Sequence, residues 1–192
     1  MDMKGKLLLP LIAIVCSAVA FNSCSKIADA IAQSFTWQGI DVIIDVPASS
    51  DTGSYATIGT GSFVYDFDSL IKDKTANQFG LKNIKSFTFK SCTLTILDPD
   101  TLNNFANFRQ AKASFSTSTN PTTTVLGEVT NNPDVYATSL NLPINNTTNI
   151  KSYLPSSGKV TLMYDLSGQI RKPVTRTIKV QAQINYTIQV AP

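Results

Sequence analysis

The sequence predicts an all-β fold, in which two antiparallel sheets pack as a sandwich with one or two short helical turns. Apolar and polar residues alternate through most of the chain, and this period of two buries one face of each strand. Gly, Pro, Asn and Asp cluster between the runs at roughly 8–12-residue spacing, as in sandwiches. Of the 192 residues, 43% are hydrophobic, which is enough for the core of one domain. We expect the sandwich to extend over residues 34–192.

The first 23 residues have the layout of a secretory signal peptide. Lys4 and Lys6 precede an apolar run from Leu7 to Phe21. Because this run is shorter than the ~20 residues that a helix needs to cross a bilayer, we expect it to be removed rather than to span the membrane.

The segment Phe21–Cys24, with the sequence FNSC, resembles the lipobox of bacterial lipoproteins. Ser23 and Cys24 match the motif, whereas Phe21 and Asn22 stand where the family usually has Leu and a small residue. The resemblance implies that residues 1–23 are cleaved off and that Cys24 is acylated. The implied partner is therefore a membrane, held through a lipid anchor.

Ser25, rather than Asp, follows the proposed lipid site. The resemblance implies that lipoproteins without Asp at this place go on to the outer membrane. We therefore expect a location in the bacterial cell envelope, lipid-anchored in the outer membrane and facing the periplasm. Residues 24–33 are then expected to form a lipid-anchored tether or a short helix.

The predicted strands follow the alternation along the rest of the chain. Phe35 and Trp37 lead into an alternating run over residues 40–46, and the change of parity at Gly39 indicates a β-bulge. A second change of parity lies near Lys90. The clearest strand is the last, because seven apolar residues alternate strictly from Ile178 to Val190. The other strands are expected at residues 63–67, 87–89, 92–96, 111–115, 125–129, 135–142 and 160–166.

Two short helical turns are expected between strands. One extends over residues 68–78, with Asp68 as its cap, and the other over residues 149–154. In pattern, the body resembles the immunoglobulin-like or fibronectin-like modules of bacterial envelope lipoproteins. A resemblance at this level transfers no functional residue.

The composition excludes several classes of function. The chain has no histidine, so it cannot form Ser-His or Cys-His nucleophile pairs or the usual zinc sites. The 16 Lys and Arg residues exceed the 13 Asp and Glu residues by only three, without a run of like charge, so we expect no nucleic-acid partner. Cys92 lies in an apolar strand and is expected to pack as a small hydrophobe. We expect neither an enzyme nor a cofactor.

Three groups of residues are candidates for a site. Asp98, Asp100 and Asn103 form a weak calcium candidate, although the same pattern is typical of a turn whose Asp and Asn side chains bond the backbone. Asp41 and Asp45 are the carboxylates that a histidine-independent hydrolase would need, and a solvated strand face is the competing interpretation. Three tyrosines without a clear inward register are expected to form a ligand-binding platform: Tyr55, Tyr136 and Tyr153.

The sequence thus predicts a membrane-anchored envelope lipoprotein that acts as a non-enzymatic binding or scaffold module. Its partner is expected to be another envelope protein or a glycan. The alternatives are a carbohydrate-binding accessory lipoprotein, a hydrolase that uses paired carboxylates, and an assembly subunit that exchanges the final strand if that strand lies at a sheet edge.

Overall fold

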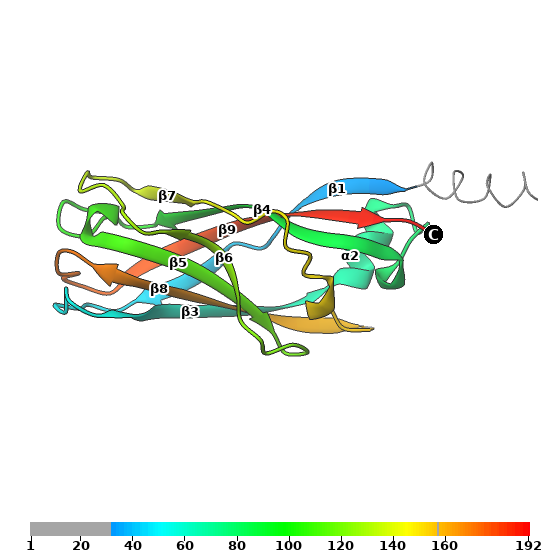
Figure 1. Ribbon diagram of the computed structural model, residues 1–192, viewed down its shortest axis with the longest axis horizontal. Helices are drawn as coiled ribbons and strands as arrows, with labels where there is room; N and C mark the ends of the chain where they lie inside the picture. Colours follow the sequence, from blue (N-terminus) through cyan, green and yellow to red (C-terminus); the bar gives the residue numbers. More distant parts are fainter. Residues whose placement is uncertain (1–31, 157) are drawn as a thin grey trace, which may run out of the picture.

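The computed structural model describes residues 32–156 and 158–192, which form two antiparallel sheets packed face to face (Figure 1). One sheet has the order β1-β9-β4-β7, with β2 also paired to β9, and the other has the order β3-β8-β5-β6. The strands are β1 (Gln33–Gln38), β2 (Val42–Val46), β3 (Tyr55–Asp66), β4 (Ile84–Ile96), β5 (Phe108–Thr117), β6 (Thr124–Val129), β7 (Ser139–Leu142), β8 (Lys159–Ile170) and β9 (Ile178–Val190). The predicted sandwich of two antiparallel sheets is confirmed.

The helical elements are short. They are α2 (Phe67–Lys74) and the 3-10 turns η1 (Leu81–Asn83), η2 (Phe105–Asn107) and η3 (Lys151–Tyr153). The two predicted helical turns correspond to α2 and η3. No helix among the described residues is long and apolar enough to cross a bilayer.

The predicted signal peptide, Cys24 and the tether up to residue 31 lie outside the described residues. Within the described part, β1 begins at Gln33, one residue before the expected start of the sandwich. Among the described residues, the buried core lies between Trp37 and Val190. These residues form one contiguous hydrophobic core within the sandwich.

Aromatic side chains fill the space between the sheets at the core. Tyr186 of β9 stacks on Trp37 and Phe87, with ring centroids 4.8 and 5.0 Å away. Its hydroxyl hydrogen-bonds that of Tyr164 on β8 at 2.5 Å, which joins the two sheets. Burial raises the pKa of both phenols above the ordinary value of 10.0, so they stay protonated.

The predicted bulge at Gly39 is confirmed by the register of β9. Gln38 lies opposite Asn185 and Val42 lies opposite Ala182, so the segment with Gly39 has one residue more than its partner. A β-carbon at Gly39 would lie 2.7 Å from the carbonyl oxygen of Ile184, and only glycine tolerates that approach. The second register shift, between Phe89 and Ser91, is also where the pattern predicts it.

The structure corrects the expected start of the helix. Phe67, predicted to end a strand, is the first residue of α2. The cap is Asp66, whose carboxylate accepts a hydrogen bond from the Ser69 amide at 3.1 Å. Asp68 was the wrong choice because its carboxylate instead accepts from the Leu81 amide at 2.8 Å and pairs with Lys72.

The position of β9 corrects the expectation of an exchangeable final strand. β9 lies in the interior of its sheet, hydrogen-bonded to β1 and β2 on one side and to β4 on the other. Both of its edges are occupied, so it has no free edge to offer to another chain.

Connections gather at the two ends of the elongated sandwich (Figure 1). The start of β1, the end of β9 and α2 lie together at one end. The loops that join β4 to β5, β6 to β7 and β8 to β9 meet at the opposite end, which we call the tip: residues 97–107, 130–138 and 171–177.

Candidate functional site

The three loops of the tip are joined by backbone hydrogen bonds between segments far apart in the sequence. The Phe105 amide donates to Ala137 at 2.9 Å, and the Arg171 amide donates to Asn107 at 2.5 Å. Because these bonds connect each loop to the next, the tip is a fixed surface rather than three independent loops.

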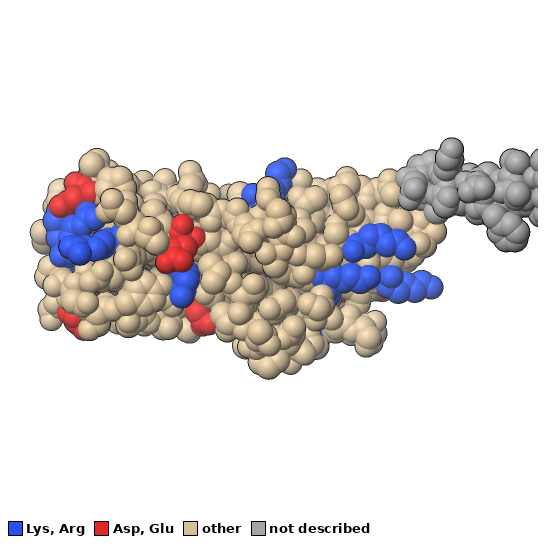
Figure 2. Space-filling model, viewed as in Figure 1, with Lys and Arg blue, Asp and Glu red and all other residues tan. Residues whose placement is uncertain are grey.

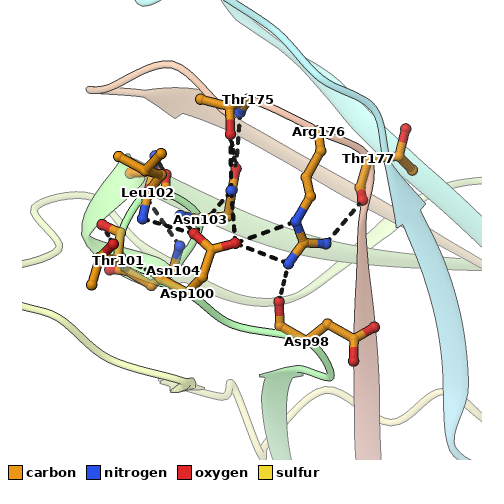
Figure 3. Close-up of polar contacts among 10 residues, drawn as sticks. Asp98, Asp100, Thr101, Leu102, Asn103, Asn104, Thr175, Arg176 and Thr177 are labelled. Carbon is orange, nitrogen blue, oxygen red and sulfur yellow. Dashed lines mark hydrogen bonds and ion pairs between the residues drawn. The ribbon is translucent and has the colours of Figure 1, made fainter.

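Asp100 is the centre of one polar cluster at the tip (Figure 3). Its carboxylate accepts hydrogen bonds from the amides of Leu102 and Asn103, each at 2.8 Å, and from Arg176 at 3.1 Å. The side-chain amide of Asn103 also donates to this carboxylate, at 3.0 Å. This bond first, and then the others, lower the pKa of Asp100 below its ordinary value. The Arg176 guanidinium also bonds the backbone oxygen of Asp98.

The same bonds decide between the two interpretations of the calcium candidate. The predicted turn, in which Asp and Asn side chains bond the backbone, is confirmed at Asp100 and Asn103. The carboxylate of Asp98 points away from this cluster in Figure 3. Among the described residues, no group of three or more His, Cys, Asp or Glu side chains is placed to hold a metal ion.

Buried asparagine side chains hold the loops from inside. Asn107 donates to the carbonyls of Leu102 and Pro173, at 2.8 and 2.7 Å, and accepts from the Asn104 amide. Asn132 donates to two carbonyls, those of Phe105 and Phe108, at 2.7 and 3.0 Å. Both side-chain amides are almost fully buried, and their nitrogens donate to backbone carbonyls of the protein. They position the surface and are not free to bind a ligand.

The charged side chains at the tip are paired with one another. Asp134 contacts Lys172 directly and lies 3.9 Å from Arg171. The hydrogen bond from Lys172 lowers the pKa of Asp134 below its ordinary value. Together with the pair formed by Asp100 and Arg176, these contacts engage all three basic residues of the tip with two of its three aspartates.

Between these groups lies an open hollow of about 440 Å³. Its lining combines polar groups such as Asn104, Asp134 and Lys172 with the apolar Leu102 and the ring of Tyr136. Among the described residues, four of the nine exposed large hydrophobic side chains belong to the tip: Leu97, Leu102, Val135 and Tyr136. Apolar side chains held at a rigid polar rim are typical of a recognition surface.

The structure separates the three predicted tyrosines. Tyr136 is 54% exposed and lines the hollow at the tip. Tyr55 is exposed on β3, with the Lys112 ammonium 5.3 Å from its ring centroid. Tyr153 is buried in η3 against Phe115, with ring centroids 5.5 Å apart, so the expectation that it is exposed is wrong. The alternation of apolar residues assigns no inward register to Tyr153, because this residue lies in a 3-10 turn rather than in a strand.

Two further predicted groups lie away from the tip. Asp41 and Asp45 project from the solvated face, where they contact Gln181 and Lys179 of β9. Cys92 is buried, and this burial raises the pKa of its thiol to about 12. Its predicted packing as a small hydrophobe is confirmed.

The exposed residues Leu102 and Val135 were not among the predicted site residues. Leu102 lies beside Asp100 in a segment whose composition predicts a turn, and an isolated apolar residue within a polar turn was the available signal. Val135 is expected to begin the strand at residues 135–142, but β7 begins only at Ser139, so Val135 lies in the loop and its side chain is exposed.

No family model and no curated protein matches this chain. Among solved structures, it is similar to one from infectious bursal disease virus strain Gx, with a TM-score of 0.38, 8% identity, and coverage of 84% of this chain but only 33% of the viral one. It is also similar to a structure from Desmodium yellow mottle tymovirus, with a TM-score of 0.27, 12% identity and coverage of 84% and 88%. A structure from turnip yellow mosaic virus has a TM-score of 0.24, 10% identity and coverage of 84% and 94%. The chain thus spans about a third of the length of the first of these proteins.

Proposed function

We propose that this protein is a bacterial envelope lipoprotein, anchored in the outer membrane through acyl chains on Cys24, whose sandwich is a non-enzymatic binding module. The observation that carries the proposal is the placement of the tip. Strand β1 begins with Gln33 at one end of the sandwich, and the loops that form the hollow lie at the other end (Figure 1). An anchor before Gln33 would leave the tip directed away from the membrane.

The chemistry of the tip supports binding rather than catalysis. The carboxylate that lines the hollow, Asp134, is engaged by Lys172 and has a lowered pKa, which does not suit a general acid or base at neutral pH. The exposed side chains of Leu102, Val135 and Tyr136 instead offer apolar area to a partner protein of the envelope.

The anchor is tested by mass spectrometry of the protein purified from a bacterial host. An N-terminal peptide that begins at Cys24 and carries acyl chains is the expected result. The Cys24→Ser variant should lack the acyl mass and leave the membrane fraction. An unmodified Cys24 in the wild-type protein would contradict the anchor.

The binding surface is tested by capture from detergent-solubilised envelope with matched variants. Val135 is 66% exposed at the tip and Val64 is 60% exposed on β3, so each can be changed to Ser without loss of core. We expect a partner that is retained by Val64→Ser and lost with Val135→Ser combined with Tyr136→Ala. Equal capture by both variants would contradict a role for the tip.

A glycan is the second candidate ligand, and Tyr136 is the observation that favours it. An exposed aromatic ring beside the polar groups Asn104 and Lys172 can stack on a sugar while they bond its hydroxyls. A glycan array probed with the wild-type protein and with Tyr136→Ala distinguishes this ligand from a protein partner. Glycan binding that requires Tyr136 would favour it.

A further inference from the structure

The end of the sandwich opposite the tip has a strongly positive surface. We call it the basic end and define it as residues 66–85 and 151–159. These ranges contain six lysines and three aspartates, an excess of three positive charges. The lysines are Lys72, Lys74, Lys82, Lys85, Lys151 and Lys159.

These lysines come from separate elements that meet in space. Lys82 of η1 and Lys151 of η3 line one hollow of about 390 Å³, although they are far apart in the sequence. Lys72 of α2 and Lys82 line a neighbouring hollow of about 470 Å³. The fold therefore gathers cations from three elements around η1.

Most of this charge is not neutralised within the protein. Of the six lysines, Lys72 forms an ion pair with Asp68, and Lys85 donates to the main-chain oxygen of Pro192 at 2.7 Å. The other four have no ion pair with any described residue. Asp66 is already used as the cap of α2. In Figure 2, blue and red atoms lie side by side at the tip, whereas the charged atoms in view at the opposite end are mainly blue.

The basic end is also where the chain enters the sandwich. Gln33 begins β1 at this end, beside α2 (Figure 1). The segment from Cys24 to Gln33 spans at most about 30 Å when fully extended. A lipid on Cys24 would therefore keep the basic end within about 30 Å of the bilayer, a distance from which it can come within the screening length of about 8 Å over which surface charges interact.

We propose that the basic end is a membrane-facing surface that binds the anionic headgroups of phospholipids and holds the sandwich upright on the bilayer. The proposal rests on the proposed function, since it assigns the anchored membrane as the partner. Each lysine near an anionic surface contributes about 1 kcal/mol. The lysines orient the domain, because the lipid supplies the attachment and the charge determines which end faces the headgroups.

The test uses the body without acyl chains, residues 24–192 with Cys24→Ser, whose sandwich contains its own core. Co-sedimentation at low ionic strength compares vesicles of phosphatidylglycerol with vesicles of phosphatidylcholine. We expect binding to the anionic vesicles alone, and release as salt is added. The double variant Lys82→Gln with Lys151→Gln should bind about 30-fold more weakly.

The matched control is Arg109→Gln with Lys179→Gln, which removes two positive charges from exposed strand residues near the tip. It should bind the anionic vesicles as the wild-type body does, and thermal melting should show all three proteins folded. Equal binding to both lipids, equal weakening by the control, or preferential binding to duplex DNA would overturn the proposal. Because the body has no acyl chain, its result is independent of whether mass spectrometry finds a lipid on Cys24.

Discussion

The two ends of the sandwich use charge in opposite ways. At the tip, Arg171, Lys172 and Arg176 each contact an aspartate, and the charges serve as links between loops. At the basic end, lysines such as Lys82 and Lys151 lack an acidic partner among the described residues and face solvent. The same fold thus has one electrically balanced end and one end with charge available to a partner.

The side-chain hydrogen bonds of the two ends also differ, and those at the tip are more numerous and more buried. Each end has a 3-10 turn closed by an asparagine, Asn107 in η2 at the tip and Asn83 in η1 at the basic end. The side chain of Asn107 is buried and holds three backbone groups, whereas that of Asn83 is partly exposed and holds two. The tip is the more rigidly constructed end, as recognition of a specific ligand requires.

The largest expected effect comes from removing the second half of β9, the strand that runs from the tip to the basic end. Deleting residues from Ile184 onward removes Tyr186, Ile188 and Val190 from the core, at about 2–5 kcal/mol for each large side chain. The summed loss is comparable to the about 5–15 kcal/mol by which a whole domain is stable, so we expect global unfolding. Circular dichroism and urea titration would measure it. A folded truncated monomer would show that the basic end is a separate unit.

An intermediate effect should distinguish the two asparagines. Asn107→Ala leaves the buried carbonyls of Leu102 and Pro173 without donors, so we expect a loss of about 2–4 kcal/mol in the free energy of unfolding. Asn83→Ala should cost about 1 kcal/mol, because water can replace its exposed contacts. Urea unfolding of both variants provides the comparison. Equal losses would mean that the two turns are equally constrained.

The smallest effect concerns the acid range. The pKa values of Asp100 and Asp134 are lowered below 3.8, so their contacts stabilise the folded protein above that pH and are lost as the pH falls through the lowered values. Carboxyl-carbon NMR titration should give midpoints below 3.8 for both, rising towards it in Arg176→Gln for Asp100 and in Lys172→Gln for Asp134. Unshifted midpoints in the wild-type protein would show that the paired charges at the tip are not formed in solution.

The sequence predicts the central strands well and the edge of the second sheet poorly. β9 is unmistakable because one face is buried along its whole length. The first half of β3 is missed because its packing requires small residues. A β-carbon at Gly59 would lie 2.4 Å from Ile44, and one at Gly61 would lie 2.5 Å from Val42. Where two strands approach so closely, the hydrophobic alternation that identifies a strand is absent.

The tip shows a second limit of predicting structure from sequence. Asn132 and Asp100 both lie in segments whose composition predicts turns, and turns are present there. Their partners, however, come from other loops, such as Phe105 for Asn132 and Arg176 for Asp100. Pairing across such separations is fixed by the sheet topology, which the local pattern does not specify. Tyr136 could be predicted as a candidate site residue, because the sequence alone shows an aromatic residue that does not follow the alternation of the core residues.

In the proposed arrangement an anchor precedes Gln33 and a partner binds the tip, so the pairing of β1 with β9 would bear the tension between them. The two strands are antiparallel, with Gln33 opposite Val190 and Gln38 opposite Asn185. A pull on the chain before Gln33 acts along the strand axis, at right angles to the hydrogen bonds between β1 and β9. These bonds are then loaded together in shear instead of being unzipped one at a time. A protein held at one end and pulled at the other would thus resist detachment from its own anchor strand.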